Sequence, residues 1–221
     1  MKRMLLTAAF AALPLMSSYA AEWKIDPNHT NARFAVDHFG TSTNMGAFTE
    51  LEGVVTFDEA QKTGFVGITI PVNKLSTGIA KFDQHLLSAD FFDAAKYPTM
   101  LFESKGWIFD PTSGDLKHID GELTIKGVTQ PIRLDTRRFN CYESPMFKSR
   151  VCGGDFSANI KRSDFGINKY SDVAMMDNVQ LIIQVEAVKK DFYDDVWKRG
   201  QNAGSPQPAA VSVRPAMPVQ P

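Results

Sequence analysis

The sequence has few residues of the kinds that usually carry chemistry. Among 221 residues there are two cysteines and four histidines, and the cysteines lack the Cys-x-x-Cys spacing of redox proteins. No two histidines lie two to four residues apart, so we predict no metal site. A Gly-x-Ser-x-Gly elbow, a phosphate-binding glycine loop and a dinucleotide fingerprint are also absent. These absences argue against the enzyme classes that such motifs mark and against any required cofactor.

An excess of charge and a long apolar run are missing as well. Lys and Arg total 24 against 25 Asp and Glu, so the formal net charge is −1 and we expect no nucleic-acid partner. The apolar stretch from Leu5 to Met16 is too short to span a bilayer. We therefore expect no transmembrane segment, while transient contact with a membrane stays open.

The first residues have the pattern of a secretory signal peptide. Lys2 and Arg3 form a basic start, the apolar stretch follows, and Ser18-Tyr19-Ala20 is a small-x-small cleavage site. We predict a signal peptide over residues 1–20 with cleavage after Ala20. Its removal takes away two positive charges and no acid, which changes the net charge from −1 to −3. The mature protein is expected outside the cytoplasm, most simply in the periplasm.

Cys141 and Cys152 would both remain in the mature chain. In an oxidising compartment such a pair indicates a disulfide. The bridge would close a loop of about 12 residues and stabilise the fold by roughly 3 kcal/mol. The alternative is a redox-active thiol pair, but no helix start flanks either residue to lower a thiol pKa.

From Arg33 to Val188 the chain repeats one pattern. Short runs carry apolar residues at every second position, and turns rich in Gly, Asp, Asn and Pro separate them. Successive strand side chains point to opposite faces, so these runs predict strands with one apolar face. Many short strands at such spacing are typical of an all-β sandwich or barrel.

We interpret residues 21–190 as one domain without internal repeats. After it, residues 191–199 predict a short helical extension. Residues 200–221 are rich in proline and alanine and have too little apolar periodicity to form a core, which predicts a disordered tail.

One segment, residues 81–95, breaks the strand pattern. Phe82 and Leu86 lie four residues apart, as do Leu87 and Phe91, which is the spacing of one helix face. We predict one or two short amphipathic helices here. They either cover a barrel mouth as a lid or form an ordinary crossover connection between strands.

Specific motifs follow one another along the chain. They are Trp23-x-Ile25-Asp26, Asn28-His29-Thr30, Phe34-x-Val36-x-His38, Gly46-x-Phe48, Phe57-Asp58, Thr77, Asp83-x-His85-Leu86, Asp90-Phe91-Phe92-Asp93, Pro98, Phe102-x-Ser104, Gly121 to Ile125, Gly127 to Thr129, Arg162-x-Asp164-Phe165-Gly166 and Val179 to Ala187. This series resembles the YceI-like family of periplasmic polyisoprenoid-binding proteins over about residues 22–190. The cysteine pair and the tail lie outside the family pattern and inherit no role from it.

The resemblance implies an antiparallel, eight-stranded, lipocalin-like barrel that holds an isoprenoid chain, such as that of a quinone or polyprenyl lipid. A barrel of this size is either filled by its own side chains or hollow enough for one small ligand. The 16 phenylalanines could fill a core or line a tunnel. The sequence leaves this choice open.

We predict the ligand-binding residues from the apolar faces of the alternating runs. They are Phe34, Val36, His38, Phe48, Ile68, Ile70, Phe102, Leu123, Ile125, Phe156, Ile160 and Ile183. Each strand is a separate prediction, because a shift of one residue exchanges the inside for the outside.

Three functional hypotheses follow. The first is a periplasmic binding or carrier protein for a long isoprenoid lipid or a similar amphiphile. The second is an enzyme acting on such a lipid or quinone, for which His38 and His85 are the candidate general bases. The third is a stress-related scaffold with a packed barrel. The head group, the chain length and the formation of a homodimer are left open.

Overall fold

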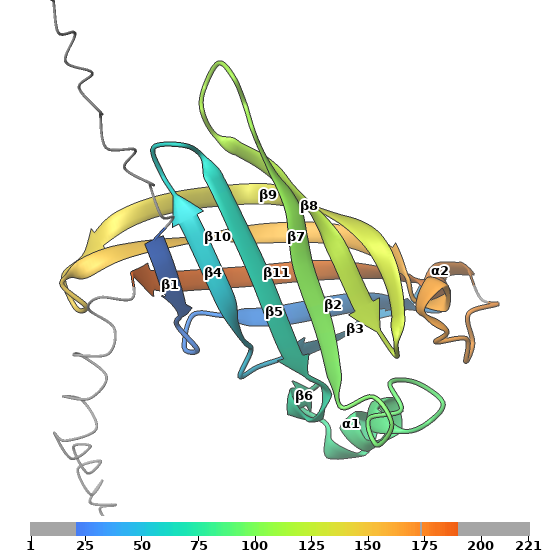
Figure 1. The fold of residues 1–221 in the computed structure, drawn as a ribbon. Coiled ribbons are helices and arrows are strands. Elements are labelled where there is room, and N and C mark those ends of the chain that lie inside the picture. The colour runs from blue at the N-terminus through green and yellow to red at the C-terminus, as the bar shows by residue number, and fades with distance from the viewer. Residues whose placement is uncertain (1–20, 173, 190–221) are drawn as a thin grey trace, which may run out of the picture.

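The computed structural model describes residues 21–172 and 174–189. Within them, an antiparallel sheet curls into a barrel, with β4, β5 and β7 crossing in front of β9, β10 and β11 (Figure 1). The predicted signal peptide, helical extension and tail lie outside the described residues.

Eleven strands and four short helical segments make up the described chain. The strands are β1 (Ala21–Ile25), β2 (Asn31–His38), β3 (Ser42–Phe48), β4 (Glu52–Asp58), β5 (Thr63–Pro71), β6 (Leu75–Ser76), β7 (Thr99–Phe109), β8 (Leu116–Ile125), β9 (Val128–Ser144), β10 (Ser149–Lys161) and β11 (Asn178–Lys189). The helical segments are η1 (Val72–Lys74), α1 (Ala80–Leu87), η2 (Arg162–Phe165) and α2 (Ala174–Asp177). None of the described helices is long and apolar enough to cross a membrane.

The barrel closes through eight antiparallel strands in the order β1-β4-β5-β7-β8-β9-β10-β11, with β11 pairing back to β1. This confirms the predicted antiparallel eight-stranded barrel. Strand β11 pairs with β1 through residues 187–189 and with β2 through residues 179–184. The ribbon β2-β3-β6 therefore continues the wall beyond β1, at the end of the sheet where α1 lies (Figure 1).

A polar corner joins β1 to β2 where both meet β11. The Thr30 hydroxyl accepts a hydrogen bond from the Glu186 backbone N–H at 3.1 Å and donates to the Glu186 carbonyl at 3.2 Å. The Asp26 carboxylate accepts a bond from the Asn28 N–H at 2.9 Å. It also bonds His29 Nδ1 at 2.8 Å, which raises the pKa of His29. The Asp-x-Asn-His-Thr motif is thus a structural corner.

Replacing Thr30 by the isosteric valine is expected to lower the free energy of unfolding by about 1–3 kcal/mol, because a buried backbone N–H loses its acceptor. Thr30 is only 1% exposed, so water cannot replace the lost hydroxyl. Urea unfolding followed by circular dichroism measures the change. Thr30→Ser keeps the hydroxyl and serves as the control. A valine variant as stable as the wild type would contradict the assignment.

The apolar faces predicted from alternation point into the barrel. On β5, Val66, Ile68 and Ile70 are buried, whereas Phe65, directly before Val66 on the same strand, is exposed. On β7, Met100 and Phe102 are buried while Leu101 is exposed. Ile119 to Ile125 of β8, Ile132 and Leu134 of β9, and Phe156 and Ala158 of β10 follow the same rule. Burial with a period of two is therefore clear on these strands, whereas neighbouring residues are both buried at Val151–Cys152 of β10 and Ala187–Val188 of β11.

Residues 81–95, predicted as one or two helices, form α1 and a series of turns. The helix begins one residue earlier, at Ala80, where the Ile79 carbonyl accepts bonds from Phe82 N–H at 2.9 Å and Asp83 N–H at 3.0 Å. The Asp83 carboxylate in turn accepts bonds from Thr77 N–H at 2.7 Å and Thr77 Oγ1 at 2.6 Å. It ends at Leu87. Beyond this point Phe92 N–H bonds back to the carbonyl of Leu86 at 3.0 Å, and the chain folds over the helix end.

Candidate functional site

A cavity of about 590 Å³ lies inside the barrel. One wall is built from three directly opposed pairs on β2 and β11, whose side chains share a face. The pairs are Ala32 with Ile183, Phe34 with Leu181, and Val36 with Val179. The wall is apolar because its six residues are the inward positions of two alternating strands.

The α1 segment covers this cavity. Phe82 and Leu86 of the helix and Phe91 and Phe92 of the following turns all line it. The Phe92 ring packs edge-on against Phe48 of β3, with 5.4 Å between centroids. The segment is therefore a cover over the interior rather than a peripheral connection. The packing of its apolar face explains the spacing of four residues seen in the sequence.

A second, smaller cavity of about 90 Å³ lies further along the barrel. Leu123, Leu181 and Ile183 line both cavities and stand between them. On β11 the lining residues continue through Val185 and Ala187, which places the small cavity toward β1.

An aromatic cluster fills the barrel beside the small cavity. Phe57 stacks on Trp107 with 5.1 Å between centroids, and Phe139 packs edge-on against both. The indole N–H of Trp23 donates to the Phe57 carbonyl at 3.1 Å. These bulky rings leave little space, so the hollow part of the barrel is the part nearer α1.

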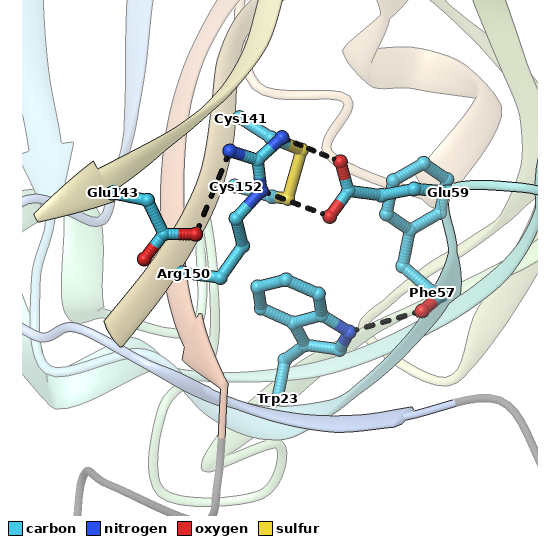
Figure 2. Close-up of a disulfide and its surroundings, with 7 residues drawn as sticks. All are labelled: Trp23, Phe57, Glu59, Cys141, Glu143, Arg150 and Cys152. Carbon is cyan, nitrogen blue, oxygen red and sulfur yellow. Dashed lines mark hydrogen bonds and ion pairs between the residues drawn. A yellow bond between two sulfur atoms is a disulfide. The ribbon is translucent and has the colours of Figure 1, made fainter.

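The Cys141–Cys152 disulfide lies at this filled end and joins directly opposed residues of β9 and β10. In Figure 2 the Arg150 guanidinium lies beside it, between Glu59 and Glu143. Its Nε and Nη2 donate to the two Glu59 oxygens at 3.0 and 2.7 Å. Among the described residues, Glu59, Cys141 and Cys152 form the one group whose possible ligand atoms lie close enough together to hold a metal ion. The two sulfurs are bonded to each other in the disulfide, so they are not available as thiolate ligands.

The predicted ligand-binding residues fall into three groups. Those lining the main cavity are Phe34, Val36, His38, Phe48, Leu123, Ile125, Ile160 and Ile183. Those lining the small cavity are Ile68, Phe102 and Phe156, together with Leu123 and Ile183. Ile70 is buried in the core and lines neither cavity.

Sequence reasoning omitted several residues of the main cavity. Ala32, Met100, Val179 and Leu181 stand on alternating faces, so their periodicity could have identified them. Other wall residues come from segments without periodicity. These are Ile167, Tyr170 and Arg162, and no sequence signal placed them at the cavity.

A few polar residues are among those that line the main cavity. They are His38, Asn44, His85, Arg162 and Tyr170. Arg33 also borders the cavity, but it lies between the inward Ala32 and Phe34 on β2 and is exposed, so its side chain points to the outer face. Phe39 and Tyr170 stand beside them with φ of 56° and 60°, in the left-handed region that bulky residues rarely adopt. Phe39 is 55% exposed, which places it at a rim in contact with solvent.

Both histidines that were candidate general bases line the main cavity. His85 packs against the Phe91 ring at 4.8 Å, and His38 packs against Phe39 at 5.0 Å. Of the described residues that line this cavity, none is an aspartate or a glutamate. A carboxylate partner that would orient either imidazole is therefore missing from the described cavity wall.

Comparison with known proteins gives consistent results. The YceI-like domain model matches residues 23–187. Protein YceI of Escherichia coli O157:H7 is 36% identical over 195 residues, covering 86% of this chain and 100% of that protein. The crystal structure of the Campylobacter jejuni YCEI protein matches with a TM-score of 0.62 and 30% identity, covering 70% of this chain and 90% of that one.

A more distant structure shares the fold. A polyisoprenoid binding domain from Saccharophagus degradans, implicated in plant cell wall breakdown, matches with a TM-score of 0.55 at 15% identity, covering 77% of this chain and 99% of that domain. The domain match, the identity to curated relatives and the closed barrel agree, and this chain belongs to the YceI-like family.

Proposed function

We propose that this protein binds one long isoprenoid lipid, of the quinone or polyprenyl type, in its main cavity and carries it through the periplasm. The observation that carries the proposal is the apolar cavity of about 590 Å³ between the β2–β11 wall and the α1 segment. The S. degradans domain of the same fold is a polyisoprenoid binder, which supports the ligand class. The signal-peptide pattern of residues 1–20 supports the compartment.

The size of the cavity suits a chain of moderate length. A cavity of roughly 150 Å³ holds benzene in another protein, about 25 Å³ per carbon, so this one has room for roughly 20 carbons. Each buried CH₂ contributes about 0.8 kcal/mol, and ten such groups contribute roughly 8 kcal/mol before association costs are subtracted. Apolar contact alone can therefore give useful affinity.

Binding without chemistry is the function that this site supports best. The residues that line the main cavity include no cysteine, serine, aspartate or glutamate within the described chain. The two histidines lack the orienting partner that a general base uses. A packed scaffold is disfavoured because the space next to α1 is not filled by side chains.

Native mass spectrometry of the protein isolated from the periplasmic fraction without detergent tests the proposal. We expect one prenyl lipid per chain, identified after solvent extraction. A protein that arrives empty and also takes up no added quinone or polyprenol would overturn the proposal and favour the scaffold.

Leu123→Ala is expected to shift chain-length preference toward longer ligands, because Leu123 stands between the two cavities. We expect the affinity ratio of hexaprenol to geranylgeraniol to rise several-fold, with a stability loss of about 2–5 kcal/mol. Displacement of a fluorescent lipid measures the ratio. Ile132→Ala is the control, since Ile132 lines only the small cavity of the two. An equal shift in both variants would contradict a role for Leu123 as the partition.

A further inference from the structure

Arg162, the first residue of η2, is buried in the wall of the main cavity. It is 7% exposed, and its guanidinium lies over the Phe91 ring, 5.8 Å from the centroid. Its Nε donates to the Met176 carbonyl at 2.7 Å and its Nη1 donates to the Ile167 carbonyl at 3.2 Å. These bonds hold a positive charge at the cavity. The guanidinium has further N–H groups beyond those two.

No carboxylate of the described residues forms an ion pair with Arg162. Asp177, whose charge acts on Arg162, accepts bonds from the Ser163 N–H at 2.9 Å and from Ser163 Oγ at 2.8 Å. Burial lowers the pKa of Arg162, and Asp177 offsets this in part. Arginine nevertheless stays protonated in proteins. Asp177 offsets only part of the cost of burying this charge, so an anion bound to the guanidinium would stabilise the site further.

The other ionisable residues that line the cavity are exposed, unlike Arg162. They are Arg33, whose side chain points to the outer face of β2, and His38, His85 and Tyr170; no acid lines the cavity within the described residues. The predicted mature chain has a net charge of −3, so the buried charge of Arg162 is opposite in sign to that of the protein as a whole. The cavity therefore has an apolar lining, and among the described residues Arg162 is the one buried ionisable side chain in it.

We propose that Arg162 binds the anionic head group, a carboxylate or a phosphate, of the lipid whose chain fills the cavity. This inference rests on the proposed function and adds the chemistry of the head group to it. The planar guanidinium fork suits the oxygens of both groups, and a charge-assisted hydrogen bond is stronger than one to a neutral hydroxyl. A cationic head group would be repelled.

A ligand series with one chain and four head groups tests the proposal. Geranylgeranyl phosphate, geranylgeranoic acid, geranylgeraniol and geranylgeranylamine are titrated into the full mature protein by displacement of a fluorescent lipid. We expect one or both anions to bind roughly ten- to hundredfold more tightly than the alcohol, and the amine to bind most weakly. The ratio of phosphate to carboxylate identifies which anion the site prefers.

Variants assign the preference to Arg162. Arg162→Met is expected to bring the affinities for anions and alcohol together, and Arg162→Lys to retain part of the preference. Lys161→Met removes the same charge from the adjacent exposed residue, which does not line the cavity, and should leave the preference intact. Circular dichroism confirms folding of each variant. If Arg162→Met does not fold, the four wild-type affinities and Arg162→Lys still decide the question.

Other outcomes separate this inference from the proposed function. Four equal affinities in the wild type, or an amine that binds as well as the phosphate, would overturn the anionic head group and leave lipid binding intact. A preference that Lys161→Met abolishes as fully as Arg162→Met would assign it to general surface charge. If none of the four compounds binds, the proposed function itself fails.

Discussion

Leu181→Asp is expected to lower the affinity for geranylgeraniol by roughly a hundredfold or more, equivalent to about 3 kcal/mol. Leu181 lies beside Phe34 in the β2–β11 wall and lines both cavities, so it stands where the two cavities adjoin. A carboxylate here would lose its hydration when an apolar chain covers it. In the empty protein the cavity has room for water around it, which lets the variant fold.

The control lies one residue away on the same strand. Gln180 is exposed and points to the outside, so Gln180→Asp introduces the same charge without touching the cavity. Ala32→Trp is a second cavity variant, which removes the space without adding charge. Displacement of a fluorescent lipid measures all three. Wild-type affinity in both folded cavity variants would show that the ligand binds elsewhere.

Removing the disulfide has the second large expected effect, on stability rather than on binding. Cys141→Ala with Cys152→Ala is expected to lower the free energy of unfolding by about 3 kcal/mol, because the unfolded chain regains the entropy that the bridge removes. For a domain of this size that corresponds to a fall in Tm of roughly 6–12 °C. Differential scanning calorimetry measures it.

Lipid affinity should stay unchanged in this double variant, because neither cysteine lines the main cavity. A reducing agent should lower the Tm of the wild type to that of the variant and leave the variant itself unaffected. A variant with the wild-type Tm would contradict a stabilising role for the bridge. Loss of binding in a folded variant would show that the filled end of the barrel influences the hollow part.

The predicted pairing of the two cysteines is confirmed, and its basis was compositional rather than geometric. When a chain with a secretory signal pattern has two cysteines, each can form an intramolecular disulfide only with the other. Their positions as directly opposed residues of β9 and β10 became visible only with the register of those strands. The neighbouring Arg150–Glu59 pair joins residues 91 positions apart, and no local pattern predicts such a contact.

The segment over residues 81–95 shows where periodicity stops being informative. Its spacing of four correctly indicated an apolar face on α1, but the turns after Leu87 keep apolar residues directed inward without helical backbone. Asp93 adopts a φ of 49°, a left-handed conformation that ends regular structure. The choice between a cover and an ordinary crossover depended on the contact of Phe92 with Phe48, which lies far away in sequence, and this contact places the segment over the cavity.

The sequence by itself determined an all-β sandwich or barrel and the apolar face of its most regular strands, and the family resemblance added the antiparallel eight-stranded barrel. Alternation with a period of two follows from backbone geometry alone, and one buried face leaves the register little freedom. Only the tertiary structure decided that the barrel is hollow near α1 and filled near Trp23 and Phe57, because a void depends on the summed volumes of side chains from many strands. It also decided that Arg162 lies at the cavity, because barrel closure places η2, which has no periodic signal, against Phe91.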